Sequence, residues 1–103
     1  MEMIFMVIQW TPYNKTEEWF EIFKKVAGKF PDYIKRWHTF ATPDGDRGIK
    51  GYNLIMVEKG NADEALLEIS KLIAPFWKIE GFAMKIEPVM GMKDAIKVLG
   101  KSL

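Results

Sequence analysis

Two runs of nearly unbroken apolar residues constrain the fold of this chain more than any other feature. Residues 3–10 read MIFMVIQW and residues 52–57 read YNLIMV. A strand with one face in water alternates apolar and polar side chains, whereas a continuous apolar run is typical of a strand covered on both faces. Both runs are far shorter than the roughly 18 residues of a membrane-spanning helix. We therefore predict that they form two central strands of one sheet.

Two further stretches have the spacing of amphipathic helices. Each begins with an Asn that stands three residues before a Glu, a pattern that caps helices, and each is followed by a helix-breaking residue. These capping and breaking residues are Asn14, Glu17 and Gly28 for the first helix, and Asn61, Glu64 and Pro75 for the second. The apolar residues at helical spacing are Trp19, Phe20, Phe23, Val26 and Ala27, and then Ala65, Leu66, Ile69, Leu72, Ile73 and Phe76.

Two less apolar segments, 33–41 and 82–89, predict edge strands, because each mixes β-formers with charged residues. The segment 42–48 is dense in turn-forming residues and predicts a hairpin loop. A short helix is expected over residues 92–99.

The order of elements is therefore βαββαβ followed by a short C-terminal helix, in a single domain covering residues 1–103. We predict an α+β fold of the ferredoxin-like type, with an antiparallel sheet of strand order 4-1-3-2 that places strands one and three at the centre. Right-handed crossovers put both long helices on one face of such a sheet. The other apolar face then needs a cover, and we expect a second copy of the chain, in a homodimer or higher homo-oligomer, to supply it.

The composition limits the kinds of molecule that this chain is expected to bind. The formal charge is only +1, from 15 basic and 14 acidic residues, so we expect neither nucleic acid nor a membrane surface as a partner. Cysteine is absent, which excludes disulfides and thiolate metal sites. The apolar start lacks a basic leader, so we expect a cytoplasmic protein. Abundant Lys and Glu beside a single Gln hint at a heat-adapted source.

Several short segments together resemble a family of uncharacterised prokaryotic domains that form dimeric α/β barrels. These segments are MVIQWTP at 6–12, Trp37 after a turn that begins with proline, residues 54–58, and EPVM at 87–90 followed by KDA at 93–95. The resemblance implies an eight-stranded barrel shared by two subunits. The wider superfamily includes cofactor-free monooxygenases, haem-handling enzymes, lactone isomerases and effector-binding domains, so the fold does not select one function.

Strand alternation suggests where a ligand would bind. If Phe82, Met84 and Ile86 face the helices, Lys85 and Glu87 face the opposite side, where a paired barrel has its cavity. Gln9 and Asn53 are the polar residues that interrupt the two apolar strands, and we expect them on that side as well. Phe5, Val7, Ile55 and Val57 would then face the same side. Five polar residues are therefore candidates for ligand binding in an apolar cavity between two sheets: Gln9, His38, Asn53, Lys85 and Glu87. The alternative is that Lys85 and Glu87 only solvate an edge strand.

His38 is the only histidine, and inside the cavity it would be able to act as a general base or bind haem iron. Surface or structural roles are commoner for a lone histidine. Asp44 and Asp46 lack the further oxygen ligands of a calcium loop, so a turn is the simpler interpretation. We predict no metal site and no cofactor.

Three functional interpretations remain open. The first is a small-ligand-binding homodimer with an apolar cavity between its sheets. The second is a cofactor-independent enzyme, of monooxygenase or isomerase type, acting on an apolar or aromatic small molecule. The third is an oligomerisation module without a ligand.

Overall fold

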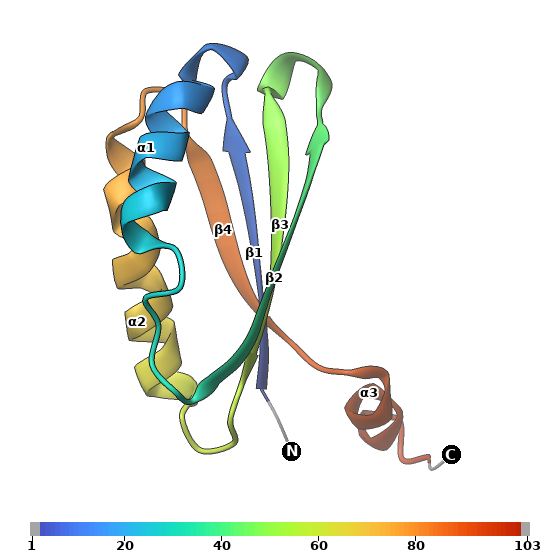
Figure 1. The fold of residues 1–103 in the computed structure, drawn as a ribbon. Helices are drawn as coiled ribbons and strands as arrows, with labels where there is room; N and C mark the ends of the chain where they lie inside the picture. The colour runs from blue at the N-terminus through green and yellow to red at the C-terminus, as the bar shows by residue number, and fades with distance from the viewer. Residues whose placement is uncertain (1–2, 102–103) are drawn as a thin grey trace.

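The computed structural model describes residues 3–101 and contains one four-stranded antiparallel sheet with three α-helices (Figure 1). The elements in chain order are β1 (Met3–Thr11), η1 (Tyr13–Lys15), α1 (Thr16–Val26), β2 (Ile34–Pro43), η2 (Gly45–Arg47), β3 (Ile49–Val57), α2 (Ala62–Ile73), η3 (Ala74–Lys78), β4 (Ala83–Val89) and α3 (Met92–Val98), where η denotes a 3-10 turn. Every strand and helix expected from the sequence is present. Of the predicted domain 1–103, residues 1, 2, 102 and 103 lie outside the described part.

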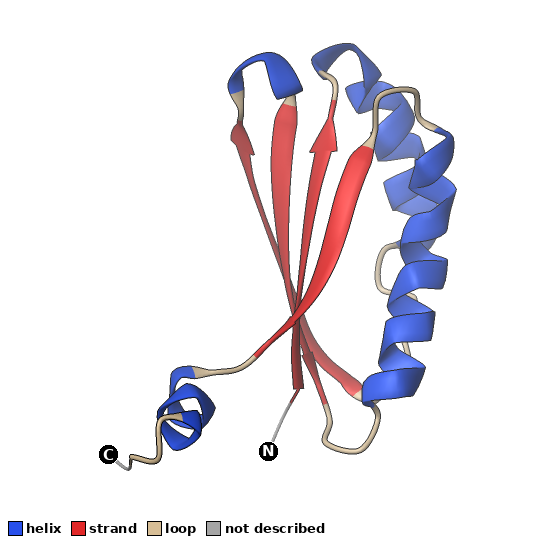
Figure 2. Ribbon diagram, turned by 180° about the vertical axis from the view of Figure 1, so that it is seen from behind, coloured by secondary structure: helices blue, strands red, loops and turns tan. Residues whose placement is uncertain are grey.

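The sheet has the strand order β2-β3-β1-β4, which is 4-1-3-2 when it is counted from the β4 edge. The two apolar runs therefore occupy its centre. All neighbouring strands are antiparallel. Helices α1 and α2 lie together on one face, and the sheet leaves its other face without a helix (Figures 1 and 2).

Burial along the central strands shows which side chains face the helices. In β1 and β3 every second residue is buried, including Phe5, Val7, Ile55 and Val57. These four side chains pack with residues of α1, α2 and η3 in one cluster. The sequence-based expectation that they point away from the helices was wrong, because both faces of these strands are apolar and alternation alone cannot choose between them.

Helix α1 also differs in detail from the prediction. Ile22 is its buried residue, whereas Phe20 is 51% exposed and lies beneath the Lys24 ammonium, which is 5.2 Å from the ring centroid. The predicted side-chain caps at Asn14 and Asn61 do not form. Asn14 lies inside η1, which runs directly into α1, and Asn61 makes no capping hydrogen bond.

Helix α3 stands away from the sheet at the end of β4 (Figure 2). The Cα radius of gyration is 15.2 Å, compared with about 13 Å for a compact domain of this length. Met92, the first residue of α3, is 73% exposed, and Val98 and Leu99 are similarly open. Among residues 3–101 no helix is long and apolar enough to cross a membrane.

Candidate functional site

The five predicted site residues lie on both faces of the sheet and do not form one site. His38, Lys85 and Glu87 occupy the helix-free face, as predicted: His38 pairs with Leu54, whose side chain points away from the helices, and the two charged residues are on the same side of β4. Gln9 and Asn53 face the helices instead and are buried. Their predicted placement was wrong.

On the helix-free face, His38 lies far from Lys85 and Glu87, so these three residues do not form one site either. His38, Leu54, Met6 and Glu87 form one row across the sheet. His38 and Glu87 are thus three strand spacings apart, or roughly 14 Å. Lys85 and Glu87 form an ion pair of 3.0 Å between half-exposed side chains, and such pairs contribute little to stability.

Asn53 is the centre of a hydrogen-bond network on the helix side. Its Oδ1 accepts hydrogen bonds from Trp37 Nε1 and Thr39 Oγ1, both at 3.0 Å. Its Nδ2 donates to the Val7 carbonyl at 3.4 Å. The amide therefore ties edge strand β2 to central strand β1, and it fixes the orientation of the Trp37 indole.

These residues border a cavity of about 170 Å³ between the sheet and the helical layer. Strands β1, β2 and β3 form its floor, and α1, the end of α2 and η3 form its walls. It is lined by Gln9, Trp19, Phe23, Val26, Ala27, Gly28, Phe30, Trp37, Thr39, Asn53, Leu72, Ile73 and Phe76. An engineered apolar cavity of about 150 Å³ holds a benzene molecule, so this space suits a single substituted ring.

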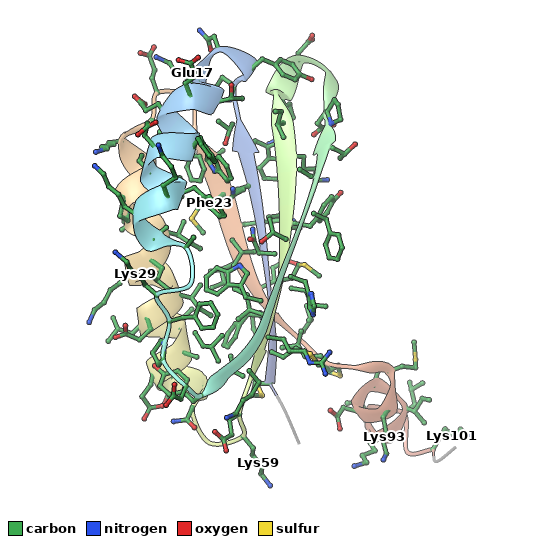
Figure 3. The ribbon with its side chains drawn as sticks, in the orientation of Figure 1. Glu17, Phe23, Lys29, Lys59, Lys93 and Lys101 are labelled. Carbon is green, nitrogen blue, oxygen red and sulfur yellow. The ribbon has the colours of Figure 1, made fainter. Side chains whose placement is uncertain are left out.

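Aromatic rings supply most of the cavity wall. Trp19 stacks on Phe23 with centroids 5.0 Å apart and also meets Phe76 at 5.9 Å. Phe30 stacks on Trp37 at 5.7 Å. Phe23 and Phe30 are each 36% exposed, so they border the entrance, near the C-terminal end of α1 and the edge strand β2. Figure 3 shows Phe23 on the side of α1 that faces the sheet.

Gln9 differs from Asn53 because its side-chain amide makes no hydrogen bond to another described residue. Only 9% of the residue is exposed, yet the side-chain hydrogen bonds of residues 3–101 include none made by Gln9. The neighbouring residue on β3 is Gly51, and a Cβ there would approach Gln9 Cγ to 3.1 Å. The missing side chain at position 51 thus leaves room for the Gln9 amide beside the cavity.

Sequence reasoning missed most of this site. Trp19 and Phe23 looked like ordinary core residues of a helix, and Phe30 belongs to an irregular segment. Trp37 lies on a strand whose mixed polarity does not show which face of the sheet it occupies. The pairing of β2 with β3 shifts between Ile34 and Arg36, and Trp37, which pairs with Ile55, faces the helical side.

A second group of polar contacts lies at the β2–β3 hairpin. Trp10 Nε1 donates to the Asp44 carboxylate at 2.8 Å, and the Arg47 guanidinium lies 3.8 Å from the centroid of the same indole. Asp44 therefore has a structural partner and helps to hold the loop against β1. Within the described residues, no group of three or more His, Asp or Glu side chains is placed to hold a metal ion.

Comparison with protein families and with curated proteins gives no relative from which residue roles can be transferred. No protein-family model matches the sequence, and no curated protein matches it significantly. The resemblance to dimeric α/β-barrel domains therefore rests on the short sequence segments alone.

Proposed function

We propose that this chain is a small-molecule-binding domain whose ligand site is the cavity between the sheet and helix α1. The observation that carries the proposal is a mainly apolar, aromatic-walled cavity that contains the buried amide of Gln9, which has no hydrogen-bond partner among residues 3–101. Natural ligand sites combine apolar walls with a few polar groups that orient the ligand. We propose this site under the helices in place of the cavity between two sheets that the sequence suggested.

Binding is favoured over acid–base catalysis by the chemistry of the lining. The polar groups at the cavity are the amides of Gln9 and Asn53, the Thr39 hydroxyl and two indoles. These groups form hydrogen bonds, but they do not gain or lose protons near neutral pH. A monooxygenase or isomerase remains the alternative function for the same cavity.

Titration with a one-ring aromatic probe tests the proposal. Toluene is added to the ¹⁵N-labelled protein while two-dimensional NMR follows the indole N–H signals of all four tryptophans. We expect the signals of Trp19 and Trp37 to shift with saturation, because both line the cavity, whereas Trp10 and Trp77 lie outside it.

A cavity-filling variant and a matched control make this test specific. Val26→Phe adds a ring inside the cavity and is expected to abolish saturable binding. Leu67→Phe adds the same kind of bulk at an exposed position of α2 and is expected to leave binding unchanged. The proposal is wrong if toluene does not bind the wild-type protein, or if Val26→Phe binds it as well as Leu67→Phe does.

We also propose that the working form is a homodimer packed through the helix-free sheet face, as in a ferredoxin-like α/β barrel. The side chains that β1 and β3 present there are mostly apolar and only half-buried: Ile4, Met6, Ile8, Trp10, Tyr52, Leu54 and Met56. A four-stranded face with four residues per strand covers roughly 500 Å², and the apolar central strands supply about half of it. This apolar centre approaches the size of the largest apolar patches of typical monomers, at about 300–600 Å².

Helix α3 supports the same partner. A standard interface buries about 800 Å² on each side, which is more than the sheet face provides. The apolar side chains of α3 and its flanks, among them Met92 and Leu99, are exposed and lie away from the chain's own core. Together the sheet face and α3 approach the area that a stable dimer needs, and a twofold axis would bring both surfaces into the interface twice.

A further inference from the structure

Resting on the proposed function, we infer that the ligand is a neutral, flat heterocycle with a ring amide that pairs with the side chain of Gln9. A ring amide places an N–H donor and a C=O acceptor side by side. A glutamine side chain carries the complementary acceptor and donor. The class therefore includes lactams and pyridone-like rings.

The first support is the state of the Gln9 amide. Buried polar side chains almost always have hydrogen-bond partners, and leaving one unpaired costs about 1–3 kcal/mol. Among the described residues, Trp19 Nε1 is the only fully enclosed side-chain nitrogen or oxygen without a partner. The Gln9 amide has no protein partner either, but it is not among the fully enclosed atoms. It is therefore accessible from the cavity that it lines.

The second support is the contrast with Asn53. Asn53 has the same functional group, but its oxygen already accepts two hydrogen bonds and its nitrogen donates one. It therefore positions the Trp37 wall and has little remaining capacity for a ligand. Of the two amides, Gln9 is the one free to recognise a molecule in the cavity.

The third support is the absence of charge in the lining. The thirteen residues that border the cavity are all uncharged. Lys29, next to this lining in sequence, is exposed and is directed away from the sheet (Figure 3). An ionised carboxylate would lose its hydration without gaining a counter-ion, which is costly. A neutral ring avoids this cost and stacks favourably on the indole and phenyl walls.

Four probes of similar size test the inference by NMR titration: 2-pyridone, N-methyl-2-pyridone, toluene and benzoate. We expect the wild-type protein to bind 2-pyridone at least about tenfold more tightly than its N-methyl analogue, because methylation removes the donor of the amide pair. Benzoate is expected not to bind. Gln9→Met keeps the length of the side chain but removes the amide, and it should abolish the preference for 2-pyridone over its N-methyl analogue.

The control is the melting temperature without ligand. Gln9→Met should keep or raise it, since the amide makes no protein hydrogen bond, whereas Asn53→Leu should lower it. The inference is overturned if toluene and 2-pyridone bind equally, if benzoate binds as tightly as 2-pyridone, or if the preference survives in Gln9→Met. Each of these results would leave the proposed small-molecule function intact. If no probe binds the wild-type protein, the proposed function fails as well.

Discussion

Single side chains in this protein have roles that their residue type alone does not reveal. Gln9 and Asn53 interrupt two apolar strands, and the sequence correctly marks them as unusual. It places them on the wrong face, because a polar group was expected to avoid the core. The structure accommodates both amides under the helices, one through three hydrogen bonds and the other beside a cavity. The face of such residues depends on tertiary space, which strand alternation does not encode.

Ile69 and Phe23 should differ in their contribution to stability. Ile69 is completely buried in α2, so Ile69→Ala is expected to lower the free energy of unfolding by about 2–5 kcal/mol. Phe23 borders the cavity entrance and is partly exposed, so Phe23→Ala should cost only about 1–2 kcal/mol. Urea denaturation at one fixed protein concentration measures both values. A loss for Phe23→Ala equal to that for Ile69→Ala would contradict this assignment.

At the scale of elements, the sequence predicts the type and order of the helices and strands, and it predicts which way side chains face where apolar and charged residues alternate. Strand β4 illustrates this: apolar Met84 and Ile86 alternate with charged Lys85 and Glu87, and their faces are as predicted. The ends of the helices are less predictable. Asn61 satisfies the capping pattern, yet its backbone angles of φ −112° and ψ 21° are not the extended conformation that a side-chain cap requires. Local patterns thus give the type of an element more securely than the hydrogen bonds at its ends.

Helix α3 makes few contacts that explain its role within one chain. We expect its apolar and its charged side chains to contribute differently to the dimer. Met92→Gln combined with Leu99→Gln removes exposed apolar side chains, and we expect the dimer dissociation constant to rise at least about tenfold because apolar area leaves the interface. Lys93→Gln combined with Lys97→Gln changes two exposed charged residues of the same helix and should have little effect. Sedimentation equilibrium measures both constants. Equal effects of the two double variants would exclude α3 from the interface.

At the scale of the whole molecule, helices cover only one of the two faces of the sheet. Two helices cover one face of the sheet, while the apolar centre of the other face is half-exposed. Helix α3, which carries Lys93, extends beyond the sheet (Figure 3). We expect the wild-type protein to sediment as a dimer at micromolar concentration. Leu54→Lys places a charge at the centre of the helix-free face and should yield a folded monomer, because an unpaired charge in an interface is costly. Leu67→Lys makes the same change on the exposed side of α2 and should remain dimeric. A monodisperse wild-type monomer, or a Leu54→Lys variant that dimerises as tightly as Leu67→Lys, would show that this face is not the interface.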